Sequence, residues 1–317
     1  MSSGRRRVGA VDCGTNSIRL LVADVGDDGR LVDLDRRMEI VRLGQGIDVS
    51  GRIAPEAMER TLAMTRVFAD RCRELGTEAV RFVATSASRD ASNADEFVAG
   101  VREAFGDLDV TPEVVSGDAE AELSFTGATG DLPGIGVDGP YLVVDLGGGS
   151  TELVRGTGHV EAALSVDVGS VRMTERHLHG DPPTDDEVVA ARADVATALD
   201  AAEGQVDLSG LGAVVGLAGS ITTITAHALG LDSYDHEAVH LARLSVDRHR
   251  SACRELWAMT RARRSALPYV HPGRVDVIGA GALVWHEVLG RVALRSPGVD
   301  VVTSEHDILD GIALSLV

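Results

Sequence analysis

The chain has 317 residues, of which 44% are hydrophobic and 25% charged, a length and composition typical of two folded domains rather than of a fibrous or disordered chain. Its 49 acidic residues outnumber its 30 basic residues, and the formal net charge of −19 disfavours binding to the phosphate backbone of nucleic acids. The sequence contains no lysine, so every basic residue is an arginine, and sites that need a lysine, such as the P-loop, are excluded.

Cysteine content and hydropathy indicate a cytoplasmic protein. The three cysteines, Cys13, Cys72 and Cys253, are scattered and odd in number, which favours free thiols in a reducing compartment. Polar residues interrupt the apolar stretch behind the basic start, so we expect no signal peptide. The longest stretch without acidic or basic residues, Leu208–Leu231, is rich in glycine, serine and threonine, so we expect no membrane partner.

The first half of the chain alternates strands and helices, which predicts an α/β domain. Apolar strands at Val8–Val11 and Ile18–Val25 flank the polar turn DCGTNS (Asp12–Ser17) and predict a hairpin. The elements expected after it are a helix over Pro55–Leu75, a strand over Ala79–Thr85, a helix over Asn93–Phe105 opened by Asn93 as its N-cap, a strand over Val110–Val115 and a helix beginning in Ala119–Phe125.

A second hairpin repeats the first. Strands at Tyr141–Val144 and Thr151–Val154 flank the turn DLGGGS, and superposing Asp12 on Asp145 also aligns Gly14 with Gly147, Ser17 with Ser150 and Leu20 with Leu153. This repeat predicts two related domains that join within Gly127–Pro140. The elements expected after the second hairpin are a strand over Val160–Val168, a helix over Thr184–Ala202 capped by Thr184 and Glu187, a short buried strand over Ala213–Gly216, helices over Ile224–Leu229, Ser245–Met259 and Val275–Val292, and an amphipathic terminal helix over Ser304–Val317.

The segment DLGGGSTE carries the strongest indication of chemistry. Three successive glycines let backbone N–H groups approach an oxyanion closely. The phosphate ligands predicted in this turn are Gly147, Gly148, Gly149 and Ser150. Asp145 and Glu152 flank the loop and can hold a hard divalent cation. The alternative is a tight hairpin whose aspartate forms an Asx turn, although a plain hairpin rarely needs three glycines.

Another loop, GLAGS at Gly216–Ser220, follows an apolar strand and opens a helix. The main-chain donors of Gly219 and Ser220, together with the helix dipole, favour a phosphate there. A simple strand-to-helix turn is the competing interpretation. The loop gains weight because it is the third phosphate-type loop, after Asp12–Ser17 and Asp145–Ser150.

These three loops together resemble those of the actin-like ATPase superfamily, in which two duplicated domains close over a phosphate chain. Six segments in order resemble the exopolyphosphatase and guanosine pentaphosphate phosphatase (Ppx/GppA) family along nearly the whole chain. The segments are AVDCGTNSIRLLVADV (Ala10–Val25), ATSASRDASNADEF (Ala84–Phe97), VVSGDAEAELSF (Val114–Phe125), VVDLGGGSTELV (Val143–Val154), GLAGSITTI (Gly216–Ile224) and PYVHPGRVDVIGAGA (Pro268–Ala282). The resemblance implies two duplicated actin-like (ribonuclease H-like) α/β domains with an interdomain phosphate-binding cleft, the first over 1–126 plus 304–317 and the second over 127–303.

The resemblance also implies roles for individual residues. The family's catalytic glutamate lies in a Ser-Gly-x-Glu-Glu-Ala-x-Leu segment, and SGDAEAEL here places Glu120 at the second glutamate, the proposed base. Ala119 replaces the first glutamate. Arg89 takes the position of a phosphate-clamping arginine, whose guanidinium suits a polyanion because it binds bidentately and keeps its charge. Without the resemblance, Glu120 would be interpreted as a solvated carboxylate at a helix start.

The reaction that the resemblance implies is hydrolysis of the terminal phosphoanhydride of inorganic polyphosphate, assisted by Mg²⁺ or alternatively Mn²⁺. Asp145 and Glu152, with Asp12 as a third carboxylate, are expected to hold the metal, and Ser17 joins the phosphate ligands. The chain ends at Val317, without the additional C-terminal domains of longer family members, which favours short polyphosphate chains.

Three alternatives stay open. Guanosine pentaphosphate (pppGpp) needs the same chemistry, although only 3% aromatic residues disfavour a guanine-stacking pocket, and (p)ppGpp could be a substrate or an inhibitor in the stringent response. The altered pair of Ala119 and Glu120 fits a non-catalytic sensor of polyphosphate or alarmone. A sugar kinase or filament-forming ATPase is disfavoured by the Glu120 segment.

We expect the protein to form a homodimer and to bind no nucleic acid.

The histidines and Cys13 predict no competing site. The pairs His177 and His179, and His236 and His240, have ligand spacing, but no cysteine or carboxylate set completes a zinc site. His306 and Asp307 lack the further histidine and aspartate of a metal phosphohydrolase. Cys13 has no histidine paired with it and is interpreted as a small residue that fills its turn.

Overall fold

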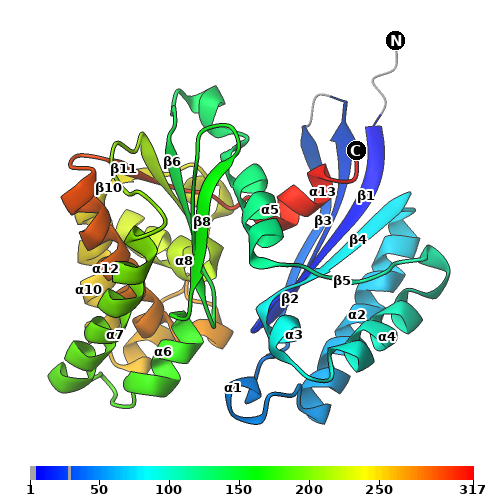
Figure 1. Ribbon diagram of the computed structural model, residues 1–317, viewed down its shortest axis with the longest axis horizontal. Helices are drawn as coiled ribbons and strands as arrows, with labels where there is room; N and C mark the ends of the chain where they lie inside the picture. The colour runs from blue at the N-terminus through cyan, green and yellow to red at the C-terminus, as the bar shows by residue number, and fades with distance from the viewer. Residues whose placement is uncertain (1–4, 28–29) are drawn as a thin grey trace. The chain divides into compact units, whose positions relative to one another are not determined.

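The computed structural model describes residues 5–27 and 30–317. The chain divides into two compact units, unit 1 with Met1–Gly127 and Ile308–Val317, and unit 2 with Ala128–Asp307 (Figure 1). Residues 304–307, which we expected in the first domain, therefore belong to unit 2. Each unit has its own mixed β-sheet with helices packed on it.

Unit 1 contains a five-stranded sheet in the order β3-β2-β1-β4-β5. Its strands are β1 (Arg5–Cys13), β2 (Ser17–Gly26), β3 (Leu31–Ile40), β4 (Ala79–Ala84) and β5 (Glu113–Val114). The first three strands form an antiparallel meander, and β4 and β5 continue the sheet parallel to β1. The predicted hairpin of β1 and β2 is confirmed.

Helices cover both faces of this sheet. The helices of unit 1 are α1 (Ile47–Ser50), α2 (Pro55–Leu75), α3 (Ser86–Asp90), α4 (Ala94–Phe105), α5 (Gly117–Thr129, whose last two residues belong to unit 2) and α13 (Ile308–Leu314), with the 3-10 turn η1 (Gly106–Leu108). One face packs against α2 and α4 through a core that includes Phe68, Phe82 and Phe97. The opposite face packs against α5 and α13, so the last helix of the chain lies on the first strands (Figure 1).

Unit 2 contains a six-stranded sheet in the order β10-β11-β9-β6-β7-β8. Its strands are β6 (Tyr141–Leu146), β7 (Thr151–Gly156), β8 (Val160–Val166), β9 (Ala213–Leu217), β10 (Arg243–Ser245) and β11 (Asp300–Thr303). The strands β6, β7 and β8 form an antiparallel meander, β9 and β11 lie parallel to β6, and β10 closes the edge antiparallel to β11.

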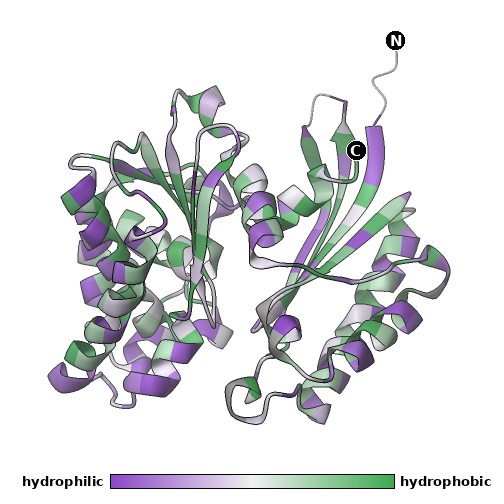
Figure 2. Ribbon diagram, viewed as in Figure 1, coloured by the Kyte–Doolittle hydropathy of each residue, from purple (hydrophilic) through white to green (hydrophobic). Residues whose placement is uncertain are grey.

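Helices of unit 2 pack around one continuous apolar core. They are α6 (Ser170–His177), α7 (Asp185–Glu203), α8 (Ala218–Leu229), α9 (His236–Val239), α10 (Val246–Ala258), α11 (Arg261–Ser265) and α12 (Ile278–Arg295), with the 3-10 turns η2 (Leu132–Ile135) and η3 (Pro272–Arg274). In Figure 2 apolar residues run along the strands, whereas the helices carry both apolar and hydrophilic segments. Within the described residues, the longest apolar helices still fall short of what a membrane crossing requires.

The predicted repeat is visible in the sheets. In each unit a three-stranded antiparallel meander is extended by parallel strands on the side of its first strand. The turns match as well, because the N–H of Gly14 donates to the carbonyl of Ser17 at 3.0 Å, and the N–H of Gly147 donates to that of Ser150 at 3.0 Å. The two hairpins therefore share one turn geometry.

Several elements differ from the sequence predictions. Strand β3 was not expected, because half of the residues in its sequence LVDLDRRMEI are charged, as suits a solvated sheet edge. The terminal helix is confined to Ile308–Leu314 instead of beginning at Ser304. Asn93 precedes α4 but does not cap it; its side chain accepts from the N–H of Ile53 at 2.9 Å and donates to the carbonyl of the same residue at 3.2 Å.

Candidate active-site residues and family

The loops of unit 1 that carry predicted site residues leave the sheet at one edge. The parallel register pairs Cys13 of β1 with Ala84 of β4, and Ala84 in turn with Val114 of β5. The carboxyl ends of three neighbouring strands therefore coincide, which is where open α/β sheets bind ligands. The loops after these strands lead to Ser17, to Arg89 in α3 and to Glu120 in α5.

Arg89 and Glu120 contact each other directly. The Nη1 of Arg89 donates to Oε2 of Glu120 at 2.7 Å and to the carbonyl of Val115 at 2.9 Å. Ser116 starts helix α5, since its Oγ accepts from the N–H of Ala119 at 3.3 Å and its carbonyl accepts from that of Glu120 at 3.0 Å. The predicted clamp thus orients the carboxylate of the predicted base.

Glu120 differs from its acidic neighbours in burial. Its side chain is 14% exposed, whereas Asp118 and Glu122 on the same helix are exposed to solvent. Helical geometry separates the directions of side chains two residues apart, so Glu122 lies on another face of α5. The sequence motif does not distinguish these three carboxylates. In the structure, Glu120 is the one that contacts Arg89.

The two carboxylates expected to hold a metal lie side by side in unit 2. Asp145 of β6 and Glu152 of β7 are directly opposite in the antiparallel register, so both side chains share one face of the sheet. Glu152 is buried, and its Oε1 accepts from Oγ of Ser165 at 2.8 Å. Carboxylate oxygens are the ligands that hard divalent cations prefer. Two carboxylates side by side on one face of the sheet therefore fit such an ion.

The corresponding positions of unit 1 provide an internal comparison. Asp12 corresponds to Asp145 in the repeat, but its cross-strand partner is Arg19 in place of a glutamate. Oδ2 of Asp12 accepts from Nη2 of Arg19 at 2.7 Å and from Nε at 3.0 Å. Asp12 therefore has a cation supplied by the chain itself, and its part in metal binding stays a prediction.

The triple-glycine loop packs against the start of α6. The carbonyl of Gly148 accepts from Val171 at 2.8 Å and from Arg172 at 3.1 Å, and a Cβ at Gly169 would lie 2.5 Å from that carbonyl oxygen. This close approach is a structural reason for the glycine at position 169. Among the described residues, no backbone carbonyl accepts from the amides of Gly148 or Gly149, so these donors suit an anion, and phosphate binding here stays a prediction.

The loop of Gly219 and Ser220 leaves the sheet beside the triple-glycine loop. Leu217 of β9 pairs with Asp145 in the parallel register, so α8 starts next to the turn that follows β6. Ser220 is buried in the first turn of α8, and Ala218 before it has a φ of 65°, a left-handed conformation that non-glycine residues seldom adopt. This strain marks a constrained turn between strand and helix.

Arg274 was missed by the sequence analysis. A Cβ at Gly219 would lie 2.0 Å from Cζ of Arg274, so only glycine lets the guanidinium lie against this loop. Arg274 belongs to the segment PYVHPGRVDVIGAGA, which the resemblance already covered without giving the arginine a role. Its position adds a fixed positive charge beside the predicted phosphate donors of unit 2.

The cysteines do not form a nucleophilic site. Cys13, Cys72 and Cys253 are buried and free. Burial, reinforced by the neighbouring Asp12, raises the pKa of the Cys13 thiol well above its ordinary value, and burial raises the pKa of Cys72 to about 12. The geometry therefore agrees with Cys13 as a residue that fills its turn.

The fold and the loops define a protein of two actin-like α/β units whose strands end in phosphate-type turns. The model of the Ppx/GppA phosphatase family matches residues 21–316. The chain belongs to the Ppx/GppA phosphatase family, and it is a hydrolase of phosphoanhydride bonds.

Three relatives illustrate the similarity. The chain is 50% identical over 316 residues to exopolyphosphatase 2 of Mycobacterium tuberculosis, with 98% of both chains covered. A solved structure of an exopolyphosphatase-like protein superposes with a TM-score of 0.92 at 44% identity, covering 98% of both chains. The Aquifex aeolicus member of the family superposes with a TM-score of 0.82 at 28% identity, covering 99% of this chain and 98% of that one. The predicted family and fold are confirmed.

Proposed function

We propose that the protein is an exopolyphosphatase that hydrolyses the terminal phosphoanhydride of inorganic polyphosphate with the help of Mg²⁺, or of Mn²⁺ in its place. The name of the Mycobacterium tuberculosis relative at 50% identity supports this substrate. The pairing of Asp145 with Glu152 supports the metal. Buried free thiols fit the expected cytoplasmic location, and the homodimer stays a prediction.

The observation that carries the proposal is the contrast between the two hairpins. Asp12 and Arg19 form a neutral pair in unit 1, whereas the same two positions of unit 2 hold Asp145 and Glu152. The same hairpin forms with either pair, so the hairpin itself does not require a glutamate at position 152. We therefore assign Glu152 a role in binding. A divalent ion held by these carboxylates would offset their charge and that of bound phosphate.

The chemistry assigned to the protein residues is simple. Glu120 accepts a proton from the attacking water, the water oxygen bonds to the terminal phosphorus, and the bridging P–O bond breaks. The terminal phosphate is released as orthophosphate. The remaining polyphosphate chain keeps the bridging oxygen and is one phosphate shorter. Arg89 is released from Glu120 to bind phosphate oxygens, for which its fork of donors is suited.

The remaining proposed ligands hold the phosphate chain. They are the backbone amides of Gly148, Gly149 and Gly219 and the donors of Ser17, Ser150 and Ser220, with Arg274 added by the structure. The N–H of Gly147, predicted as a further ligand, donates to the carbonyl of Ser150 instead. Backbone and hydroxyl donors recognise phosphate whether a further phosphate or a nucleoside is attached beyond it. This set therefore also suits pppGpp, and polyphosphate is favoured by the low aromatic content and by the name of the Mycobacterium tuberculosis relative.

Orthophosphate release tests the proposal. The full chain is assayed with polyphosphates of defined lengths and with pppGpp, side by side, with Mg²⁺ and with excess chelator. We expect release from polyphosphate that exceeds release from pppGpp, and none in chelator. Binding of either compound without release would identify a sensor and contradict the proposal.

Product lengths test the preference for short chains. If long chains dissociate between cleavage steps, intermediate lengths accumulate on a gel during the reaction. Conversion of long polyphosphate to orthophosphate without intermediates would contradict this preference.

A further inference from the structure

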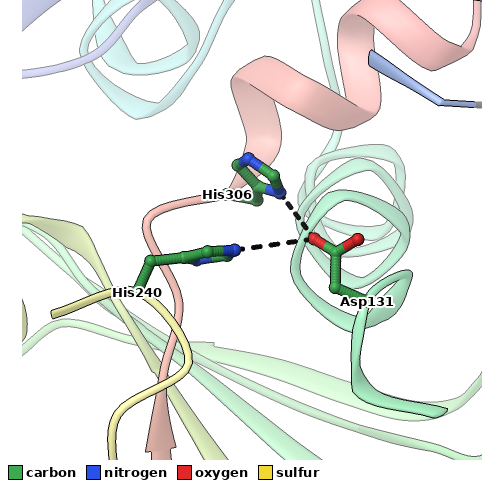
Figure 3. Close-up of side chains that lie close together, drawn as sticks. All are labelled: Asp131, His240 and His306. Atoms are coloured by element: carbon green, nitrogen blue, oxygen red, sulfur yellow. Dashed lines mark hydrogen bonds and ion pairs between the residues drawn. The ribbon is translucent and has the colours of Figure 1, made fainter. Parts of the chain in front are cut away.

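Two histidines and an aspartate that lie far apart in the sequence meet in unit 2 (Figure 3). Nδ1 of His306 lies 2.8 Å from Oδ2 of Asp131, and Nε2 of His240 lies 3.7 Å from the same oxygen. The two imidazole rings have centroids 4.4 Å apart. We propose that Asp131, His240 and His306 form a binding site for a transition-metal ion such as Zn²⁺, in addition to the Mg²⁺ proposed at Asp145 and Glu152.

The spacing of the three ligand atoms suits such an ion. Zinc binds histidine nitrogen and carboxylate oxygen at about 2.0–2.2 Å, so two of its tetrahedral ligands lie about 3.3 Å apart. The distances of 2.8 Å and 3.7 Å from the aspartate oxygen bracket this value, and all three atoms lie within 4.8 Å of one another. Side-chain movements of about half an ångström would bring both of these distances to the value expected for zinc.

The donor set decides the class of metal. Two imidazole nitrogens and one carboxylate oxygen suit Zn²⁺ and its neighbours among the transition metals, whereas Mg²⁺ prefers oxygen ligands alone. Asp145 and Glu152 offer only oxygen. The two sites are therefore distinguished by their chemistry, and excess Mg²⁺ can fill one without competing strongly for the other.

The three residues come from separate parts of the chain. Asp131 follows α5, His240 follows α9, and His306 follows β11 and precedes α13. The chain passes between the units at 127/128 and at 307/308, so Asp131 and His306 each lie within a few residues of one of the two crossings. An ion here would hold both crossing segments to the loop of His240, inside unit 2.

The surrounding contacts set the cost of binding. The backbone N–H of Glu305 donates to Nδ1 of His240 at 3.2 Å, which directs Nε2 toward Asp131. An ion on Nε2 needs the tautomer with its proton on Nδ1 and so displaces this contact, which lies at the long, weak end of the range for hydrogen bonds. Without an ion, the carboxylate of Asp131 contacts both imidazoles directly.

The test is zinc binding to the full chain. Protein stripped with chelator is dialysed against Zn²⁺ in phosphate-free buffer with excess Mg²⁺, and bound zinc is measured. Co²⁺ then replaces zinc, because its visible absorption reports nitrogen and oxygen ligands directly. The variants are Asp131→Asn, at an exposed position where the shape is kept, and His306→Gln. The control is His159→Gln, an exposed imidazole between β7 and β8.

We expect one zinc per chain in the unaltered protein and in His159→Gln. Asp131→Asn and His306→Gln should bind at least about tenfold more weakly, since loss of even an outer partner of a metal ligand typically costs that much. Circular dichroism checks that each variant is folded. Zinc bound no more tightly by the unaltered protein than by folded Asp131→Asn, or an equal loss in the control, would overturn the proposal.

Discussion

Arg89 positions the carboxylate of Glu120, the predicted general base. The bond of 2.7 Å between them fixes the carboxylate of Glu120 at the start of α5. Arg89 carries the charge that the substrate needs, so arrival of a phosphate offers its guanidinium a second anion. In the proposed mechanism, binding of substrate would therefore release the base from Arg89.

The variant Glu120→Gln should lose turnover while it still binds polyphosphate. The amide keeps the size and reach of the side chain but cannot accept the proton, and loss of a general base typically slows a reaction by about 10²- to 10⁴-fold. Removing one negative charge also favours a polyanionic ligand. Single-turnover release and equilibrium binding measure the two effects separately.

Glu122→Gln is the matched control for this change. Glu122 is exposed on another face of the same helix, so the turnover of Glu122→Gln should match that of the unaltered protein. Normal turnover in Glu120→Gln together with a collapse in Glu122→Gln would reassign the base and show that Ala119 shifts the register of the motif.

At the scale of elements, helices α10 and α12 bury a histidine. His249 is fully buried, its Nδ1 accepts from Nε1 of Trp285 at 3.3 Å, and burial lowers its pKa from 6.5 to about 4. The unfolded chain takes up a proton on this ring below pH 6.5, whereas the folded chain does so only below about pH 4. Stability therefore falls as the pH decreases through this window.

The variant His249→Leu should flatten this part of the pH dependence. The histidine contributes up to about 3 kcal/mol of the stability lost between pH 6.5 and 4, because of the shift of its pKa. The variant also loses the hydrogen bond from Trp285. This loss lowers its stability by the same amount at every pH and so does not affect the slope of stability against pH. Urea unfolding at several pH values measures both, and equal slopes for the two proteins would refute the assignment.

The elements also show how far the sequence predicts the molecule. Helix α2 has the predicted bounds Pro55–Leu75, since proline starts it and Gly76, with a φ of 69°, ends it. The capping box of Thr184 and Glu187 is likewise present. These features depend on neighbours within a few residues, and local sequence therefore predicts them.

Features that depend on distant partners were missed. Asn93 was expected as a cap, but it bonds the backbone of Ile53. Arg274 lies against Gly219, and His240 receives its carboxylate from Asp131, in a distant part of the sequence. No spacing rule within a segment reveals such contacts, because the sheet topology creates them. The predicted pairing of Asp145 with Glu152 succeeded because one hairpin contains both residues.

At the scale of the whole chain, an ion pair joins its two ends within unit 1. Asp310 of α13 is fully buried and bonds the guanidinium of Arg36 in β3, which also contacts Asp33. Charge attraction from Asp310 opposes burial and raises the pKa of Arg36. The last helix is thus held to the sheet by a charged contact as well as by apolar packing.

The variant Arg36→Met should lower the free energy of unfolding by about 3 kcal/mol, because the buried carboxylate of Asp310 loses its ion pair with Arg36. Arg52→Met is the control, since the pair of Arg52 and Glu96 is exposed and such pairs contribute about 0–1 kcal/mol. Denaturant unfolding compares the two. Equal losses would show that α13 is held by packing alone.

The central claim is that Asp145 and Glu152 hold the divalent ion on which phosphate release depends. The most direct test is orthophosphate release from polyphosphate against Mg²⁺ concentration, for the unaltered protein and for Glu152→Arg, which copies the pair of Asp12 and Arg19. We predict saturable dependence on Mg²⁺ in the unaltered protein and no release stimulated by Mg²⁺ in the folded variant. The same dependence in both proteins, or full release in chelator with metal shown to be absent, would contradict the account.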